Sequence, residues 1–370
     1  MGVKRISRTA GAVVAAAAMA VGLAGCEPPE TWWPTMLDGP EVQGPRSTAV
    51  VGDFDEDGLE DVYWYAPGSS GQAEELWTAR PEGGFDRAPA PSVTGSYDPV
   101  AGDFDGDGDD DILWLGVEGG GSVWTFEGGH VASRRSVDIS PSLDAEHVVV
   151  IERASGPDHV GLVVGDASFI SDGLWIWDPL QDDWFDSAYV EGGRAPLPFA
   201  GDFDGDGHGD VLLYGYGSRP DSIGWGRADG GYDTQTLAIN GTYWIAVLDA
   251  DGDGRDDIVF FQGPQGTAPT VPLWRGRAGR WFAKTNVGAP TVSGDIWAQE
   301  DRGDGRDNVI VRAEGVDQVW ELGADGAATI HTIPDFQWGV PVLGQFSAAG
   351  RDDMYVWGYR KDRLYLSPQG

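Results

Sequence analysis

The sequence predicts an all-β fold, a seven-bladed β-propeller with four-stranded blades. An acidic segment recurs seven times, starting near residues 53, 103, 152, 202, 249, 300 and 345. These starts are about 45 to 51 residues apart, the spacing expected when each repeat forms one blade. Apolar runs flank each segment, and no part of the chain after residue 30 has sustained helical periodicity.

Each repeat has the order of elements expected of one blade. An apolar run enters the acidic segment and a second leaves it, as at 61–65 and 111–115, and both runs are typical of buried strands. Glycine-rich turns separate a third strand from a weaker fourth. The third strands carry an aromatic residue at Trp77, Trp124, Trp175, Trp225, Trp274, Trp320 and Tyr365.

The last repeat ends at Gly370, soon after its third strand, so its sequence provides no fourth strand. The apolar segment 31–37, ahead of the first repeat, can supply that outer strand and close the ring from the N-terminus. The alternative is that this segment is only a tether between a lipid and the domain.

The N-terminus is typical of an export signal. Three cations, Lys4, Arg5 and Arg8, precede an apolar run at 10–23, and Leu-Ala-Gly leads directly into Cys26. This ending resembles the bacterial lipobox, which predicts a lipoprotein signal peptide at 1–25, a lipidated Cys26 with a tether at 26–30, and the propeller at 31–370. We therefore expect an extracytoplasmic protein, anchored by lipid to a membrane of the bacterial cell envelope. The alternative for Cys26 is a buried structural thiol.

The formal net charge of the chain is −36, and Cys26 is its one cysteine. So many carboxylates repel phosphate, so nucleic acid is excluded as a partner, whereas a polyanion is suited to binding cations. With a single cysteine, the chain has no internal disulfide, and stability has to come from packing and metal.

Four repeats carry aspartate at positions 1, 3, 5 and 9 of the acidic segment. Alternate side chains of such a loop can converge on one cation, glycine at position 6 permits the sharp turn, and the main-chain oxygen at position 7 adds a donor. The predicted ligands are Asp53, Asp55, Asp57, Leu59 and Asp61; Asp103, Asp105, Asp107, Asp109 and Asp111; Asp202, Asp204, Asp206, His208 and Asp210; and Asp249, Asp251, Asp253, Arg255 and Asp257.

These loops predict four Ca²⁺ ions, in repeats 1, 2, 4 and 5. Several hard oxygen donors on a flexible loop favour Ca²⁺ over Mg²⁺, which needs rigid octahedral geometry, and over Zn²⁺, which takes nitrogen or sulfur. An EF-hand is excluded because position 12 is not Glu and strands flank the loop. A solvated acidic turn is disfavoured, since four neighbouring aspartates repel without a cation.

The other three repeats depart from the pattern, and we predict no calcium in them. In the sixth, Arg302 stands among Glu300, Asp304 and Asn308, so its guanidinium can replace the metal with an internal ion pair. The seventh keeps only Asp353 of the four aspartates, and the third has lost the pattern.

At these residues the chain resembles the FG-GAP or VCBS repeat family, the propeller type also found in integrin α-subunits. The motif Gly-Asp-Phe-Asp-Gly-Asp-Gly is intact at 102–108 and 201–207, and the resemblance covers essentially all of the chain after the signal. It implies that the acidic loops join the first and second strands of each blade on one face of the ring. Partners vary widely within the family, so the fold does not settle the function.

We expect a monomeric, non-catalytic binding or adhesion module for a protein or glycan ligand. No nucleophile elbow, phosphate loop, His-Glu-x-x-His motif or Cys/His cluster occurs, and the five histidines share no repeat position. The alternative is an extracellular polysaccharide lyase or glycoside hydrolase, which needs two carboxylates outside the loops facing one pocket. A lectin is a further option within the binding class. Its aromatic candidates are Trp184, Trp244, Trp281, Trp297 and Trp338.

Two short motifs are interpreted as coincidences. Arg302-Gly303-Asp304 spells a tripeptide that integrins recognise, but it falls inside the sixth acidic segment, where the repeat explains each residue. Asn240-Gly241-Thr242 matches a glycosylation acceptor, but carries little weight in a bacterial chain.

Overall fold

The computed structural model describes most of the chain after residue 31. The described residues are 32–33, 35–40, 42, 48–66, 73–116, 120–138, 145–164, 172–190, 196–215, 217, 219–262, 270–288, 296–301, 305–313, 316–323, 327–333, 339–357 and 362–367. The expected signal segment and Cys26 lie outside them. Within these residues, no helix is both long and apolar enough to span a bilayer.

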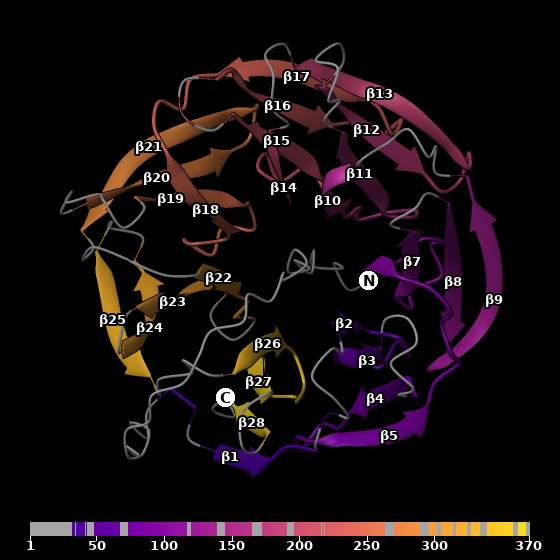
Figure 1. Ribbon diagram of the computed structural model, residues 1–370. Coiled ribbons are helices and arrows are strands. Elements are labelled where there is room, and N and C mark those ends of the chain that lie inside the picture. The colour runs from indigo at the N-terminus through magenta and orange to yellow at the C-terminus, as the bar shows by residue number, and fades with distance from the viewer. Residues whose placement is uncertain are drawn as a thin grey trace.

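Seven four-stranded antiparallel sheets stand around a central axis like the blades of a propeller (Figure 1). Every named element is a strand, so the predicted all-β class and the seven four-stranded blades are confirmed. In six sheets the strands follow the order of the sequence from the centre outwards, and the seventh sheet has the order β26-β27-β28-β1.

Each blade contributes one strand to each of four concentric layers (Figure 1). The innermost strands are β2 (Thr48–Gly52), β6 (Tyr97–Gly102), β10 (Ala145–Ile151), β14 (Leu197–Gly201), β18 (Tyr243–Leu248), β22 (Ile296–Gln299) and β26 (Val340–Gly344). The second strands are β3 (Asp61–Tyr65), β7 (Asp111–Gly116), β11 (His159–Val164), β15 (Asp210–Tyr214), β19 (Asp257–Gln262), β23 (Asn308–Ala313) and β27 (Asp353–Trp357). The third strands are β4 (Glu75–Ala79), β8 (Gly121–Glu127), β12 (Asp172–Asp178), β16 (Asp221–Gly226), β20 (Thr270–Arg277), β24 (Val316–Leu322) and β28 (Arg363–Leu366). The outermost strands are β5 (Phe85–Pro89), β9 (His130–Val137), β13 (Asp183–Val190), β17 (Tyr232–Leu237), β21 (Trp281–Gly288), β25 (Ala328–Ile333) and β1 (Thr35–Asp38).

The outer strand of the seventh blade comes from the other end of the chain. β1 pairs antiparallel with β28, from Thr35 opposite Leu366 to Asp38 opposite Arg363. The two preceding tryptophans, Trp32 and Trp33, are each 4% exposed and pack into a cluster with residues of blades 6 and 7. The first ordered strand therefore covers an edge that β28 would otherwise leave open.

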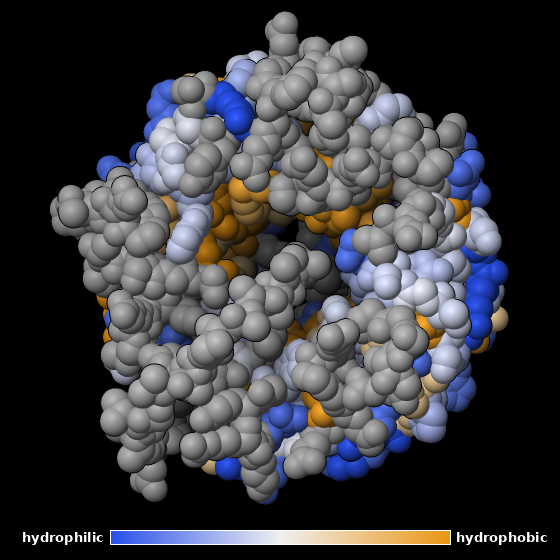
Figure 2. Space-filling view, in the orientation of Figure 1, coloured by the Kyte–Doolittle hydropathy of each residue, from blue (hydrophilic) through white to orange (hydrophobic). Residues whose placement is uncertain are grey.

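The hydrophobic core lies between neighbouring blades. One cluster joins Tyr63 and Leu76 of blade 1 to Ile112 and Trp114 of blade 2, and another joins blade 7 to blade 1 around Trp77. The second strands are buried along nearly their whole length because a blade covers each of their faces. Hydrophilic residues are seen on the outer rim, and hydrophobic residues show around the central hollow (Figure 2).

All seven predicted aromatic residues lie on third strands, but two blades depart from the common register. Trp77, Trp124 and Trp274 each lie opposite the second residue of their blade's second strand. In blade 3 the residue opposite Val160 is the fully buried Trp177, and Trp175 lies opposite Leu162. In blade 4 the residue opposite Val211 is Gly224, directly before Trp225.

Candidate functional site

The connections between the first and second strands of the blades form one closed ring. We call them loops 1 to 7, at residues 53–60, 103–110, 152–158, 202–209, 249–256, 300–307 and 345–352. At every junction a main-chain amide at the end of one loop donates to the carbonyl of the first residue of the preceding loop, and Glu60 donates to Gln345 between loops 1 and 7. The loops therefore lie on one face of the propeller and contact each other around it.

A carboxylate reinforces six of these seven junctions. In each, the last residue of one loop is acidic and accepts a hydrogen bond from the main-chain amide that begins the preceding loop. These acceptors are Asp110, Asp158, Asp256, Asp307, Asp352 and Glu60. Loop 4 has Gly209 instead, and a Cβ there would lie 2.6 Å from the Glu152 carbonyl oxygen.

Sequence reasoning missed these junction carboxylates. Their signal was an acidic residue directly before the last aspartate of the pattern in repeats 1, 2 and 5. Nothing local showed that its partner was a main-chain amide in another blade.

The predicted ligand aspartates of the four loops do converge. Three carboxylates per loop have oxygens within 4.8 Å of one another. Two oxygens bound to the same Ca²⁺ at 2.3–2.6 Å can be at most about 5 Å apart, so this spacing fits one shared ion. The clusters are Asp53, Asp55 and Asp57; Asp103, Asp105 and Asp111; Asp202, Asp204 and Asp206; and Asp249, Asp251 and Asp253.

The first aspartate of each loop also organises the loop itself. Asp202 Oδ1 accepts from the amides of Gly205 and Asp206, and its Oδ2 accepts from Gly207. Asp53 and Asp249 accept equivalent bonds. The glycines at position 6 have left-handed backbone angles, with φ of 85° at Gly58 and 81° at Gly254, as the sharp turn requires.

The aspartate at position 9 holds the second strand to the third. Oδ1 of Asp61, Asp111, Asp210 and Asp257 accepts from a main-chain amide of the third strand in its own blade. In loops 2 and 4 the second oxygen accepts from Phe104 or Phe203. Oδ2 of Asp61 and Oδ2 of Asp257 are buried and have no hydrogen-bond partner among the described residues.

Burial makes these position 9 carboxylates reluctant to ionise. Burial, together with the neighbouring loop aspartates, raises the pKa of Asp61, of Asp111 and of Asp257 to about 8. It also raises the pKa of Asp53 to about 6. A bound divalent cation would favour the charged forms, so both the oxygens and the electrostatics of loop 1 fit calcium.

At position 7 the main-chain amide has a hydrogen-bond partner within the loop. The amides of Leu59, Asp109, His208 and Arg255 donate to the position 5 aspartates of their loops. The side chain of Asp109 accepts from Gly128. The predicted role of the position 7 carbonyl oxygens as ligands stays a prediction.

In the repeats predicted to lack calcium, protein groups contact one another. Gln345 of loop 7 donates its side-chain amide to Asp352, and Arg351 forms an ion pair of 2.6 Å with Asp301 of loop 6. Arg302 and Asp304, the expected internal ion pair of the sixth repeat, lie outside the described residues.

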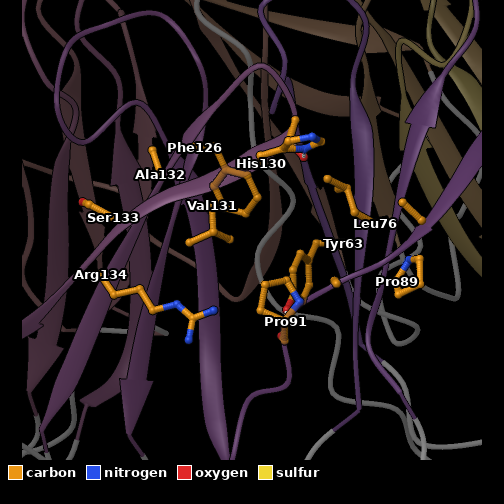
Figure 3. Close-up of a pocket in the computed structure, with 13 residues that line it drawn as sticks. Tyr63, Leu76, Pro89, Pro91, Phe126, His130, Val131, Ala132, Ser133 and Arg134 are labelled. Atoms are coloured by element: carbon orange, nitrogen blue, oxygen red, sulfur yellow. Dashed lines mark hydrogen bonds between the residues drawn. The ribbon is translucent and has the colours of Figure 1, made fainter.

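A cavity of about 550 Å³ opens between blades 1 and 2, where β4 and β5 face β8 and β9 (Figure 3). The guanidinium of Arg134 at its edge lies over the Trp124 ring, 3.9 Å from the centroid, and the buried Tyr63 hydroxyl donates to the Pro91 carbonyl. No acidic residue is among the described residues that line it. Its main side chains are Tyr63, Leu76, Phe126, His130, Val131 and Arg134.

Of the five aromatic residues singled out for glycan stacking, the three whose side chains the structure describes do not gather at one place. Trp281 is 54% exposed, whereas Trp244 and Trp297 pack against separate core clusters. Nothing is described of the Trp184 side chain, and Trp338 lies outside the described residues.

Comparisons with known proteins agree with the repeat pattern. Residues 53–114 match the model of the FG-GAP-like repeat. No curated protein matches the chain. Among solved structures, similar chains include an Agrocybe aegerita lectin described as recognising non-reducing terminal N-acetylglucosamine (14% identity, TM-score 0.44, 84% of this chain and 74% of that one). The Dos1 propeller (11%, 0.48, 88% and 80%) and a putative 6-phosphogluconolactonase from Bacteroides fragilis (14%, 0.45, 80% and 92%) are also similar.

These structures, at such low identities, carry no information about the ligand of this chain. The match at residues 53–114 covers loops 1 and 2. The chain is therefore a seven-bladed β-propeller that carries FG-GAP-like repeat sequence in its first two blades.

Proposed function

We propose that the protein is a calcium-binding, non-catalytic surface lipoprotein that binds a protein or glycan ligand outside the cytoplasm. The observation that carries this proposal is the convergence of three carboxylates in each of four loops of one continuous ring. Carboxylates packed this closely repel one another strongly unless a cation lies among them.

Calcium would be held by the aspartates at positions 1, 3 and 5 in loops 1, 4 and 5, and by those at positions 1, 3 and 9 in loop 2. In loop 1 the buried Oδ2 of the position 9 aspartate is also available. When bound, the ion supplies positive charge that cancels the repulsion between these carboxylates. The first residue of each such loop also bonds to the next blade through its amide and carbonyl. Calcium would therefore stiffen the junctions between blades, and its role is structural support of a binding surface.

The cavity between blades 1 and 2 is a candidate place for a ligand. Its aromatic and aliphatic floor suits an apolar side chain or the face of a sugar ring, and His130, Ser133 and Arg134 offer polar contacts at its edge. Acid and base catalysis on a glycosidic bond needs two carboxylates, which this lining does not provide. The cavity thus favours binding over the lyase or glycosidase alternative.

Two measurements on the purified full-length protein test this proposal. Calorimetric titration should detect calcium binding, and excess chelator should lower the unfolding temperature. A glycan array, probed in millimolar calcium and in chelator, then separates the ligand classes. Calcium-dependent binding to a defined set of sugars indicates a lectin. No binding to the array by folded protein favours a protein ligand. Absence of any calcium binding would refute the proposal.

The lipid anchor needs its own test. We expect the Cys26→Ser variant to lose membrane association and covalent lipid, with the propeller still folded, because the thiol would be the attachment point. Intact-mass analysis and membrane fractionation measure this, and equal membrane association of both proteins would refute the anchor.

A further inference from the structure

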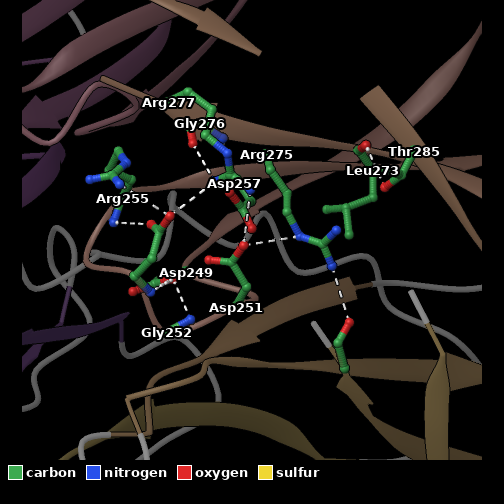
Figure 4. A network of polar contacts seen from close by, with 12 residues as sticks. Asp249, Asp251, Gly252, Arg255, Asp257, Leu273, Arg275, Gly276, Arg277 and Thr285 are labelled. Atoms are coloured by element: carbon green, nitrogen blue, oxygen red, sulfur yellow. Dashed lines mark hydrogen bonds and ion pairs between the residues drawn. The ribbon is translucent and has the colours of Figure 1, made fainter. Parts of the chain in front are cut away.

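Arginines occupy the space around the carboxylates of loop 5. Asp251 Oδ2 lies 3.2 Å from Nε of Arg275 and 3.2 Å from Nη2 of Arg277 (Figure 4). Asp253 Oδ2 lies 2.9 Å from Nη1 of Arg277 and 3.3 Å from Nη2 of Arg255. Two of the three clustered aspartates are thus already paired with cations from the protein.

Arg275 is part of the interior. It is 6% exposed, and its Nη2 donates to the carbonyl of Gly323 in blade 6 at 3.1 Å. A buried guanidinium needs an anion beside it, and removing that anion leaves a charge in a medium that solvates it poorly. Asp251 is therefore the counter-ion that keeps Arg275 in place.

Loop 1 offers the matched comparison. The third strand is aligned by the amide that donates to the position 9 aspartate, Ala79 in blade 1 and Gly276 in blade 5. By this alignment the residue equivalent to Arg275 is Thr78. The residue equivalent to Arg277 is Arg80, which forms its ion pair with Asp86 on the neighbouring strand and not with the loop.

The two loops consequently differ in charge and not in oxygen supply. In the described part of the chain, no arginine or lysine forms an ion pair with the four aspartates of loop 1. Asp55 Oδ1 and Asp251 Oδ1 are equally buried without a hydrogen-bond partner. Calcium affinity depends on the net charge of the ligand set, so three neighbouring guanidinium groups disfavour a divalent cation in loop 5.

Loop 4 is intermediate. Arg280 contacts Asp204 at 3.2 Å, but its side chain is 32% exposed and is shared with Asp233. Displacing Arg280 from Asp204 leaves no buried charge behind, because the guanidinium keeps Asp233 and water.

We propose that Arg275 and Arg277 take the place of calcium in loop 5, so that the protein binds three calcium ions, in loops 1, 2 and 4. This inference rests on the proposed calcium binding by the aspartate loops. The sequence suggested that a guanidinium replaces the metal in the sixth repeat, and this inference applies the same replacement to the fifth.

The test is the calcium stoichiometry of the full-length protein and of two matched variants, measured by calorimetric titration and by elemental analysis after dialysis. Asp57→Asn and Asp253→Asn change the same position 5 in loops 1 and 5. We expect three equivalents in the wild type, two in Asp57→Asn, and still three in Asp253→Asn. Four equivalents in the wild type that fall to three in Asp253→Asn would overturn the inference and leave calcium binding itself intact.

A gain-of-binding variant provides the complementary readout. Arg275→Thr with Arg277→Thr removes both guanidinium groups and introduces at position 275 the residue that blade 1 has there. We expect a fourth equivalent of calcium, and a folded double variant that still binds three would count against the inference. If the double variant does not fold, the Asp253→Asn stoichiometry decides the question. Wild-type protein that binds no calcium would overturn both the proposed function and the count of three.

Discussion

Removing a junction carboxylate should lower the stability of the fold strongly, even in a loop for which no metal is predicted. Asp158 is 5% exposed and accepts two main-chain hydrogen bonds, from Asp103 in the preceding blade at 3.1 Å and from Arg153 in its own at 2.9 Å. Asp158→Ala removes both acceptors and leaves two amides without partners. At about 1–3 kcal/mol for each donor left without a partner, the free energy of unfolding should fall by about 2–6 kcal/mol.

Urea unfolding in excess calcium measures this loss as a lower midpoint at unchanged slope. Asp158→Asn retains one side-chain oxygen, so we expect it to lose about half as much. The control is Asp86→Ala, which removes an ion pair with Arg80 on the exposed face of β5 and should leave the midpoint unchanged. The reasoning is refuted if Asp158→Ala is no worse than this control, or if Asp158→Asn is as damaging as Asp158→Ala.

Three further predictions concern single side chains. Gly209→Ala places a Cβ 2.6 Å from the Glu152 carbonyl oxygen, so the free energy of unfolding measured in urea should fall by about 1–3 kcal/mol. An unchanged midpoint would mean that the backbone of the junction shifts to relieve this contact. Burial raises the pKa of Asp353 to about 6, so the folded state binds this proton more tightly than the unfolded state and loses stability as pH rises from about 4 to 6. Asp353→Asn should therefore stabilise the protein by up to about 2 kcal/mol at pH 7 and have no such effect at pH 4. An equal effect at both pH values would contradict this expectation. The Tyr214 hydroxyl donates to a carbonyl at 2.9 Å and accepts from the Tyr243 amide at 2.8 Å, so Tyr214→Phe should lower the unfolding free energy by about 1–2 kcal/mol, and a loss below about 0.3 kcal/mol would contradict the expectation.

The fold could be predicted because its signals are local and repeated. Each blade begins with an apolar run, a glycine turn and a second apolar run, so seven copies of one short pattern fixed the number of blades. The register of the third strand was harder to predict: the repeat position is Trp177 in blade 3 and Gly224 in blade 4. A tryptophan one or two residues away on the same strand looks equivalent in the sequence.

The composition of the aspartate loops could also be predicted, but their electrostatic surroundings could not. The carboxylate clusters arise from residues within one turn of chain, whose spacing is visible in the sequence. Arg275 acts on Asp251 from a strand 24 residues further along, and Asp110 acts on Asp53 from the next blade. Such partners are chosen by the packing of blades, which a single sequence does not display.

Because the same residues form the metal loops and the blade junctions, calcium should protect specific amides from hydrogen exchange. In loop 1, the Asp53 amide donates to Asp110, whose amide donates back to the Asp53 carbonyl. Between loops 6 and 7, Glu300 and Asp352 form the same pair of bonds without a predicted metal.

We expect chelator to speed exchange at Asp53 and Asp110 by about tenfold or more, which corresponds to about 1.4 kcal/mol of local stability, and to leave Glu300 and Asp352 unchanged. Mass spectrometry of labelled peptides resolves the two junctions. Equal acceleration at both would mean that calcium stabilises the whole ring without acting through its own junctions. If chelator speeds exchange at neither junction, calcium does not contribute to the packing of the blades. The hydrogen bonds between neighbouring loops would then persist even when no cation neutralises the carboxylates.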